Sequence, residues 1–254
     1  MSGSVRVRIL GIGMGAHHVT PEVSRALAET DYVLAARKRD DDGLLAARRA
    51  IAAAHGVEVV EVPDPERDRD APADYPAAVR AWHAARVSAY EEILRARRGT
   101  AAFLVWGDPG LYDSTIRIVE GIAARLPLSY DVLPGISAPQ VLAARHRMVL
   151  HPVADPVHVT TARRLRQDIA AGQRNLVVML GGAPALEGLD DWSIWWGANL
   201  GADSEELVAG RVAEVSRDLT AARERARASA GWVMDIALLR APDGSAPPLE
   251  GGAG

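Results

Sequence analysis

The first half of the chain alternates short apolar runs with longer stretches in which apolar residues recur every three or four positions. The short runs predict strands, and the longer stretches predict amphipathic helices. Strands that alternate with helices in this way indicate an α/β fold built on a parallel sheet. The predicted strands are Val5–Leu10, Asp31–Ala36, Val57–Val62, Ala101–Trp106 and Tyr130–Leu133, and the predicted helices are Pro21–Glu29, Leu44–Ala54, Tyr75–Arg97 and one that begins near Ser114.

The second half has a less regular pattern. It predicts strands at Val157–Thr161, Asn175–Leu180, Ser193–Asn199 and Trp232–Leu239, helices at Ala162–Ala171 and Thr220–Ala228, and a helix-like segment at Glu205–Val215 that Gly210 stops. We place the domain boundary after Gly135, with one domain at 1–135 and a second at 136–241. The proline- and glycine-rich tail, 242–254, is expected to be disordered.

Three strands of the first half end in loops that contain glycine. The sequences are GIGMG at 11–15, GDPG at 107–110 and PGISA at 134–138. Glycine allows the backbone to approach a ligand closely, and open α/β sheets bind ligands at the carboxyl ends of their strands. Three such loops at one sheet edge therefore indicate a ligand site.

The first loop also matches the dinucleotide fingerprint G-x-G-x-x-A, with Gly11, Gly13 and Ala16. That fingerprint requires a helix to open within the glycines, so that its N-terminus meets the pyrophosphate. Here Thr20 is the expected N-cap and Pro21 the first helical residue, so the loop is too long for this geometry. We therefore give the dinucleotide interpretation second place.

Composition narrows the class of protein. The chain has 254 residues, and its hydrophobic fraction of 48% supports a packed core. With no cysteine, disulfides, thiolate metal sites and cysteine nucleophiles are excluded. A net charge of −4 disfavours nucleic-acid binding, and no signal-peptide or membrane-spanning pattern is found. We expect a cytoplasmic protein that binds neither nucleic acid nor membrane.

The order of the motifs resembles the tetrapyrrole methylases, which are S-adenosylmethionine-dependent enzymes of corrin and sirohaem synthesis. The specific motifs are GDPGLY and LPGISA, and the resemblance extends from about Val5 to about Leu239. The stretches GIGMGAHHVTPEV, DYVLAARK, GDPGLYDST and WGANLG point to a branch that couples methylation to loss of an acetyl unit. One departure is the first loop, in which relatives often have GPGDP and this chain has Met14 in place of the proline.

The resemblance implies two αβα domains, an N-terminal one with a parallel sheet and a C-terminal one with a mixed sheet. It also implies S-adenosylmethionine in the cleft between them, and a homodimer that acts on a small-molecule tetrapyrrole. By motif position, the cofactor-binding residues are Met14, Gly107, Asp108, Leu111, Ser137, Ala138, Leu180 and Ala198.

Release of an acyl unit requires water and a general base. The candidates near the loops are Asp113, His18, His17 and Asp108, with Tyr112 as a hydrogen-bond donor, although Asp113 could equally cap a helix. Arg145, Arg147 and Lys38 are candidates to bind substrate carboxylates. No third ligand accompanies the two adjacent histidines, so we expect no metal site.

Two other hypotheses remain open. One is a methylase of the same family that modifies another position of the macrocycle. The other is a nucleotide-binding sensor of NADP type that uses the first loop alone.

Overall fold

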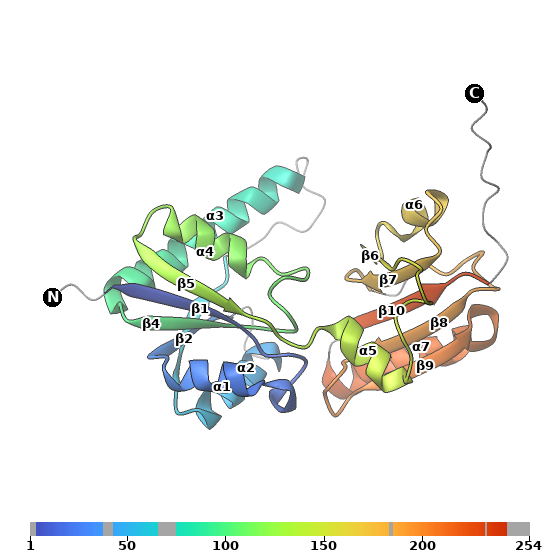
Figure 1. The fold of residues 1–254 in the computed structure, drawn as a ribbon, viewed down its shortest axis with the longest axis horizontal. Helices are drawn as coiled ribbons and strands as arrows, with labels where there is room; N and C mark the ends of the chain where they lie inside the picture. The colour runs from blue at the N-terminus through green and yellow to red at the C-terminus, as the bar shows by residue number, and fades with distance from the viewer. Residues whose placement is uncertain (1–3, 38–42, 66–74, 183–184, 232, 243–254) are drawn as a thin grey trace. The chain divides into compact units, whose positions relative to one another are not determined.

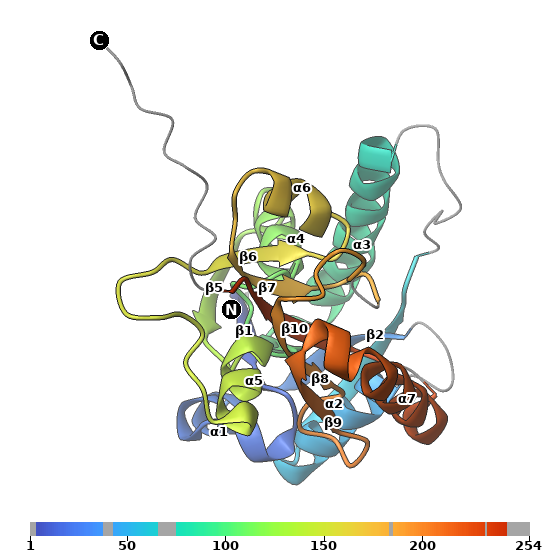
Figure 2. The ribbon, with the colours of Figure 1, turned by 90° about the vertical axis from the view of Figure 1, so that its right-hand side faces the viewer.

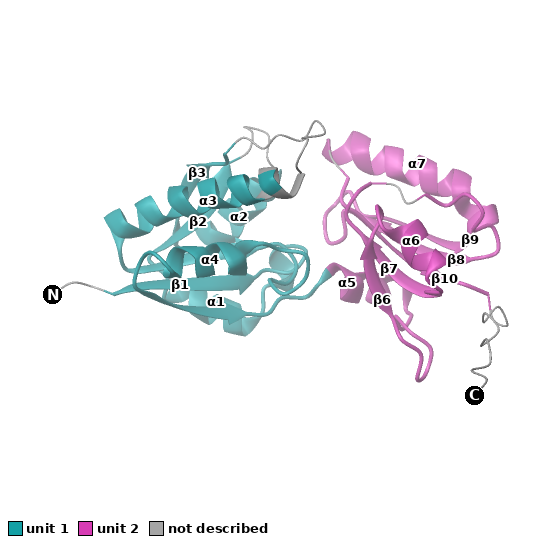
Figure 3. Ribbon diagram, turned by 90° about the horizontal axis from the view of Figure 1, so that it is seen from above, with its two compact units in different colours: residues 1–137 teal, residues 138–254 magenta. Residues whose placement is uncertain are grey.

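A computed structural model describes residues 4–37, 43–65, 75–182, 185–231 and 233–242. The chain forms two compact units, 1–137 and 138–254 (Figure 3). The division falls between Ser137 and Ala138, whereas the sequence placed it after Gly135. The predicted tail, Pro242 excepted, lies outside the described residues, as does Lys38.

Unit 1 contains a five-stranded parallel sheet, as the alternating pattern predicted, in the order β3-β2-β4-β1-β5. Its strands are β1 (Val5–Gly11), β2 (Tyr32–Arg37), β3 (Glu58–Pro63), β4 (Thr100–Val105) and β5 (Leu128–Leu133). Its helices are the 3-10 turn η1 (Ala16–His18), α1 (Pro21–Ala28), α2 (Gly43–Ala54), α3 (Tyr75–Arg97) and α4 (Thr115–Ala123).

Helices cover both faces of this sheet, with α3 and α4 on one side and α1 and α2 on the other (Figure 1). Successive strand residues point to opposite faces, so each face has its own core. On β4, Phe103 packs toward α3 and α4, while Leu104 packs toward α1 and α2. This double burial explains why the strands read as continuous apolar runs in the sequence.

The start of α1 follows the predicted capping pattern. Thr20 has an extended backbone, its hydroxyl accepts a hydrogen bond from the Val23 N–H at 3.2 Å, and Pro21 occupies the first helical position. The turn η1 separates the glycines of the first loop from this cap. The spacing that argued against a dinucleotide fingerprint is thus present in the structure.

Unit 2 contains a mixed sheet in the order β6-β7-β10-β8-β9, in which only the β6–β7 pair is parallel. Its strands are β6 (His158–Thr161), β7 (Asn175–Met179), β8 (Ser193–Ala198), β9 (Glu206–Arg211) and β10 (Asp235–Arg240). Its helices are α5 (Ala138–His146), α6 (Leu165–Ala170) and α7 (Val212–Ala230). In Figure 2, α5 and α7 lie on opposite sides of the sheet.

The prediction for Glu205–Val215 was wrong, because this segment contains β9 and the start of α7. Its main chain pairs with β8 in an antiparallel register, so tertiary pairing overrides local helix propensity. Gly210, expected to stop a helix, instead lies within β9 with φ of +155°. No helix that the structure describes is long and apolar enough to cross a membrane.

Candidate active site

The three glycine loops of unit 1 lie together at the carboxyl edge of the sheet, as predicted. They follow β1, β4 and β5, and β1 is hydrogen-bonded to both other strands. Across the first two loops, the Gly107 N–H donates to the Gly13 carbonyl at 2.8 Å, and the Gly13 N–H donates to the Gly107 carbonyl at 3.2 Å. The first and second loops therefore form one continuous backbone surface.

Glycine is required where the loops meet because the backbones touch. A Cβ atom on Gly11 would lie 2.4 Å from the Gly135 nitrogen. A Cβ atom on Gly135 would lie 2.2 Å from the Gly107 carbonyl oxygen. Both distances are well inside van der Waals contact, so no side chain fits at either position without displacing a loop.

Asp108 joins the second loop to the third. Its Oδ1 accepts from the Gly110 N–H at 2.8 Å, and its Oδ2 accepts from the Gly135 N–H at 2.9 Å. Both carboxylate oxygens thus hold main chain, which leaves this residue suited to positioning the loops rather than to moving a proton.

Gly107 presents an open side. It has φ of +73°, and a Cβ atom built on it would meet nothing nearer than the Met14 sulfur at 3.9 Å. The Met14 N–H donates to Nδ1 of His18 at 3.2 Å, and the His18 ring contacts that of His17 edge to face at 4.2 Å. The His18 ring therefore holds the first loop, and the Met14 sulfur is the only atom of the described residues within 4 Å of a Cβ built on Gly107.

The second loop continues into α4 through Leu111, Tyr112 and Asp113. Tyr112 is exposed and has φ of +51°, a conformation that costs free energy for a residue with a side chain. Oδ1 of Asp113 accepts from the Thr115 N–H at 2.6 Å, whereas Ser114 makes no side-chain capping bond. Asp113 therefore caps α4, and its second oxygen is not used in that bond.

The predicted cofactor residues of unit 2 occupy several environments. Leu180 is exposed after β7 with φ of +54°, while Ala198 is completely buried in β8. Any ligand contact by Ala198 would therefore come from its main chain. Ser137 ends unit 1 and Ala138 begins α5.

The candidate substrate-binding arginines lie at the end of α5. Nε of Arg145 donates to Oε1 of Glu205 at 2.7 Å, so this charge is already compensated within unit 2. Arg147 follows the helix with φ of +53°.

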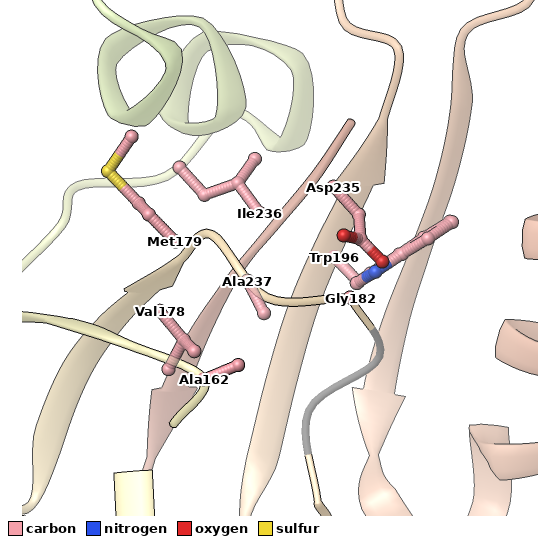
Figure 4. A pocket seen from close by; sticks show the side chains of 8 residues that line it. All are labelled: Ala162, Val178, Met179, Gly182, Trp196, Asp235, Ile236 and Ala237. Atoms are coloured by element: carbon pink, nitrogen blue, oxygen red, sulfur yellow. The ribbon is translucent and has the colours of Figure 1, made fainter. Parts of the chain in front are cut away.

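A small cavity lies in unit 2 next to the strand end that precedes Leu180 (Figure 4). Its volume is about 10 Å³, close to the space that one water molecule needs. Nε1 of the buried Trp196 has no hydrogen-bond partner among the described residues, while the Asp235 carboxylate accepts from Arg223 at 3.0 Å. The cavity is too small for a whole organic ligand.

A larger cavity, about 140 Å³, lies in unit 1 at the ends of β2 and β4. Asp113 lines it together with Arg48, Arg86 and Tyr90, which the sequence did not single out as site residues. In the sequence these three are ordinary positions of amphipathic helices, and Tyr90 reads as an apolar one. No local signal in the sequence distinguishes these residues, because only the packing of α2 and α3 against the sheet brings them beside Asp113.

Comparison with known proteins gives concordant results. The sequence matches the family model of the tetrapyrrole (corrin/porphyrin) methylases over residues 6–216. A curated precorrin-6A synthase (deacetylating) from Sinorhizobium sp is 42% identical over 252 residues, which cover 94% of this chain and 96% of the relative.

Solved structures show the same fold. A cobalamin synthesis related protein (CobF) from Corynebacterium diphtheriae has a TM-score of 0.80 at 34% identity, covering 93% of this chain and 99% of that one. A uroporphyrin-III C-methyl transferase from Thermus thermophilus, complexed with S-adenyl homocysteine, has a TM-score of 0.56 at 16% identity and covers 92% of each chain. The second likeness concerns the fold alone.

Proposed function

Because the chain belongs to the tetrapyrrole (corrin/porphyrin) methylase family, we propose that it is a precorrin-6A synthase of the deacetylating kind. The reaction transfers the methyl group of S-adenosylmethionine to carbon C1 of precorrin-5 and releases the acetyl unit. The main support is the 42% identity, over nearly the full length of both chains, to a relative with this activity. A methylase of different regiospecificity is the alternative within the family.

The glycine loops fit the cofactor that this reaction requires. A Cβ built on Gly107 would meet no described atom nearer than the Met14 sulfur at 3.9 Å, and Asp108 fixes this backbone against the third loop. Main-chain groups at such an edge can hold the amino-acid and ribose portions of a nucleoside cofactor. In our proposal the contacts come from Met14, Gly107, Asp108, Leu111, Ser137, Ala138, Leu180 and Ala198.

Methyl transfer to carbon is an in-line displacement, and bound S-adenosylmethionine supplies an electrophilic methyl group. The protein's task is to align this group with a ring carbon that is already nucleophilic. Alignment and proximity can lower the barrier by roughly 7–11 kcal/mol. Rigid loops fixed by backbone hydrogen bonds, such as the Gly13–Gly107 pair, are suited to that task.

Release of the acetyl unit is a hydrolysis. Water adds to the acetyl carbonyl carbon, the bond from that carbon to the macrocycle breaks, and its electron pair passes into the macrocycle. A base must take the proton of the attacking water. We assign this role to Asp113, with Tyr112 as a hydrogen-bond donor and His18 as the alternative base.

Calorimetric titration with S-adenosylhomocysteine tests the cofactor assignment without the unstable macrocycle. The proposal predicts one saturable site per chain and no binding that depends on an added metal. Lack of saturable binding would remove the basis of the proposed activity. The family resemblance also leads us to expect a cytoplasmic homodimer, and sedimentation equilibrium would measure its mass.

A further inference from the structure

The larger cavity of unit 1 lies where β2 and β4 end, at the same sheet edge as the glycine loops. Its volume of about 140 Å³ is similar to that of an engineered protein cavity of about 150 Å³ that holds benzene. It can therefore receive a group of a few heavy atoms. The polar side chains that line it are Arg48, Arg86, Tyr90, Asp113 and Thr115.

Both guanidinium groups are fixed in the cavity wall. Nε of Arg48 donates to the Leu104 carbonyl at 2.8 Å, which anchors α2 to the end of β4. Nε of Arg86 donates to Oδ1 of Asp64 at 2.6 Å, and these two side chains are only 12% and 7% exposed. The cationic groups thus keep their positions without a ligand.

Tyr90 supplies a neutral donor to the same cavity. Its ring packs edge to face against Phe103 at 4.9 Å, and its side chain is buried. Burial raises the pKa of the Tyr90 phenol above 10.0, so the hydroxyl keeps its proton at neutral pH. Charges around the cavity also act on this hydroxyl, namely those of Arg86, Asp64, Arg48 and Asp113.

Three side chains other than the Asp64-paired Arg86 can donate into this space, namely those of Arg48, Tyr90 and Thr115. The Asp113 carboxylate is the only anionic side chain among the described residues that line it. A small ligand whose oxygens accept hydrogen bonds fits this lining, which is the chemistry of a carbonyl or a carboxylate.

We propose that this cavity, the acyl cavity, binds the two-carbon acyl unit that the enzyme removes, with Arg48 and Tyr90 donating to its oxygen and Asp113 beside it. The inference rests on the proposed function and adds to it the place where the acyl group sits. After hydrolysis the same donors hold the acetate. One of its oxygens is the former carbonyl oxygen, and the other comes from the attacking water.

The placement accounts for how Asp113 can act on water. Its Oδ1 accepts from the Thr115 N–H, and Oδ2, which takes no part in that bond, can accept the proton of the water. Developing negative charge on the carbonyl oxygen during water attack is met by donors that are already in position, which is how oxyanion-binding groups accelerate acyl chemistry.

Binding of [13C]acetate to the full-length protein tests the acyl cavity directly. Relaxation of the acetate signal is expected to show saturable binding, weakened about tenfold or more in Arg48→Gln and in Tyr90→Phe. Arg49→Gln is the matched control, because Arg49 is the next residue of α2 but pairs with Glu61 instead of lining the cavity. Unchanged binding in both cavity variants, or no saturable binding at all, would overturn the proposal.

A second readout distinguishes a functional role from a structural one. In single turnover, Tyr90→Phe should slow acetate release by about 10²-fold while S-adenosylhomocysteine binds as tightly as to the wild type. Acetate release at the wild-type rate, or an equal loss of cofactor affinity, would contradict the placement of the acyl unit. An enzyme that transfers methyl normally but binds no acetate would refute the acyl cavity and leave the proposed function intact, so the two failures can be told apart.

Discussion

At the scale of single residues, two aspartates of one loop have separate tasks. Asp108 uses both carboxylate oxygens to hold backbone N–H groups, so it fixes the loops against each other. Asp113 uses Oδ1 for the cap of α4 and faces the acyl cavity. Sequence alone left capping and catalysis as equal alternatives for Asp113, and the structure makes the two compatible, because different oxygens can serve them.

Asp113→Asn should impair acyl release more than cofactor binding. The amide oxygen still accepts from the Thr115 N–H, so α4 keeps its cap, but the amide cannot take a proton from water. We expect acetate release to fall by a factor of about 10²–10⁴ while S-adenosylhomocysteine binds as tightly as to the wild type. Rapid-quench analysis of one turnover would measure the acetate and calorimetry the cofactor affinity, and acetate release at the wild-type rate would reduce Asp113 to a capping residue.

Gly107→Val should abolish S-adenosylhomocysteine binding, because a branched side chain would fill the space in front of the loop. The positive φ of Gly107 also makes this substitution costly for folding, by about 1–2 kcal/mol. Gly56→Val is the matched control, since Gly56 has φ of +69° and no atom within 4 Å of an added Cβ.

Thermal unfolding and calorimetry should separate the two glycine effects. Both variants are expected to lose similar stability, and only Gly107→Val to lose cofactor affinity. If Gly107→Val binds as tightly as Gly56→Val, the second loop does not contact the cofactor.

At the scale of elements, the sequence predicted the sheet of unit 1 well, since strands buried on both faces have continuous apolar runs. It failed at β9, an edge strand with the sequence ELVAGR, whose pairing with β8 cannot be seen locally. It also gave no expectation for α5, a short helix with proline at its second position.

The glycine loops were predictable for a different reason. Glycine and proline mark turns in the sequence itself, and the order of parallel strands then brings the turns to one edge. Arg48 and Tyr90 carry no such mark in the sequence, so the acyl cavity could be recognised only in the folded structure.

The β6–α6 pair of unit 2 should show a defined pH dependence. Asp168 on α6 is buried and accepts from the Thr160 hydroxyl, while Nε2 of His158 and Nη2 of Arg164 each lie 3.2 Å from its oxygens. The Thr160 hydroxyl, followed by His158 and Arg164, holds the pKa of Asp168 below its ordinary value of 3.8. This aspartate therefore stabilises the fold above about pH 4, and the contribution is lost as pH falls through the lowered pKa.

Denaturant unfolding of Asp168→Asn at a series of pH values would measure this contribution. The difference in stability from wild type should be full at pH 6 and should shrink as the pH falls below about 4. The exposed Asp203 supplies the control, and Asp203→Asn should match wild type throughout. A difference for Asp168→Asn that stays constant down to pH 2 would contradict the ionic interpretation.

At the scale of the whole molecule, the fold is shared with methyltransferases of tetrapyrrole synthesis, and the loops determine what it binds. NAD and NADP should not bind specifically, because η1 and the Thr20 cap separate α1 from the glycines that would face a pyrophosphate. Fluorescence titration with the reduced dinucleotides would measure this, and saturable micromolar binding would restore the sensor hypothesis.

Mass spectrometry of the product from precorrin-5 and methyl-labelled S-adenosylmethionine tests the central claim most directly. The account predicts a macrocycle that has gained one labelled methyl group and lost its acetyl unit, with one equivalent of acetate in solution. A macrocycle that gains the label and keeps the acetyl unit, or one that gains no label, would contradict it.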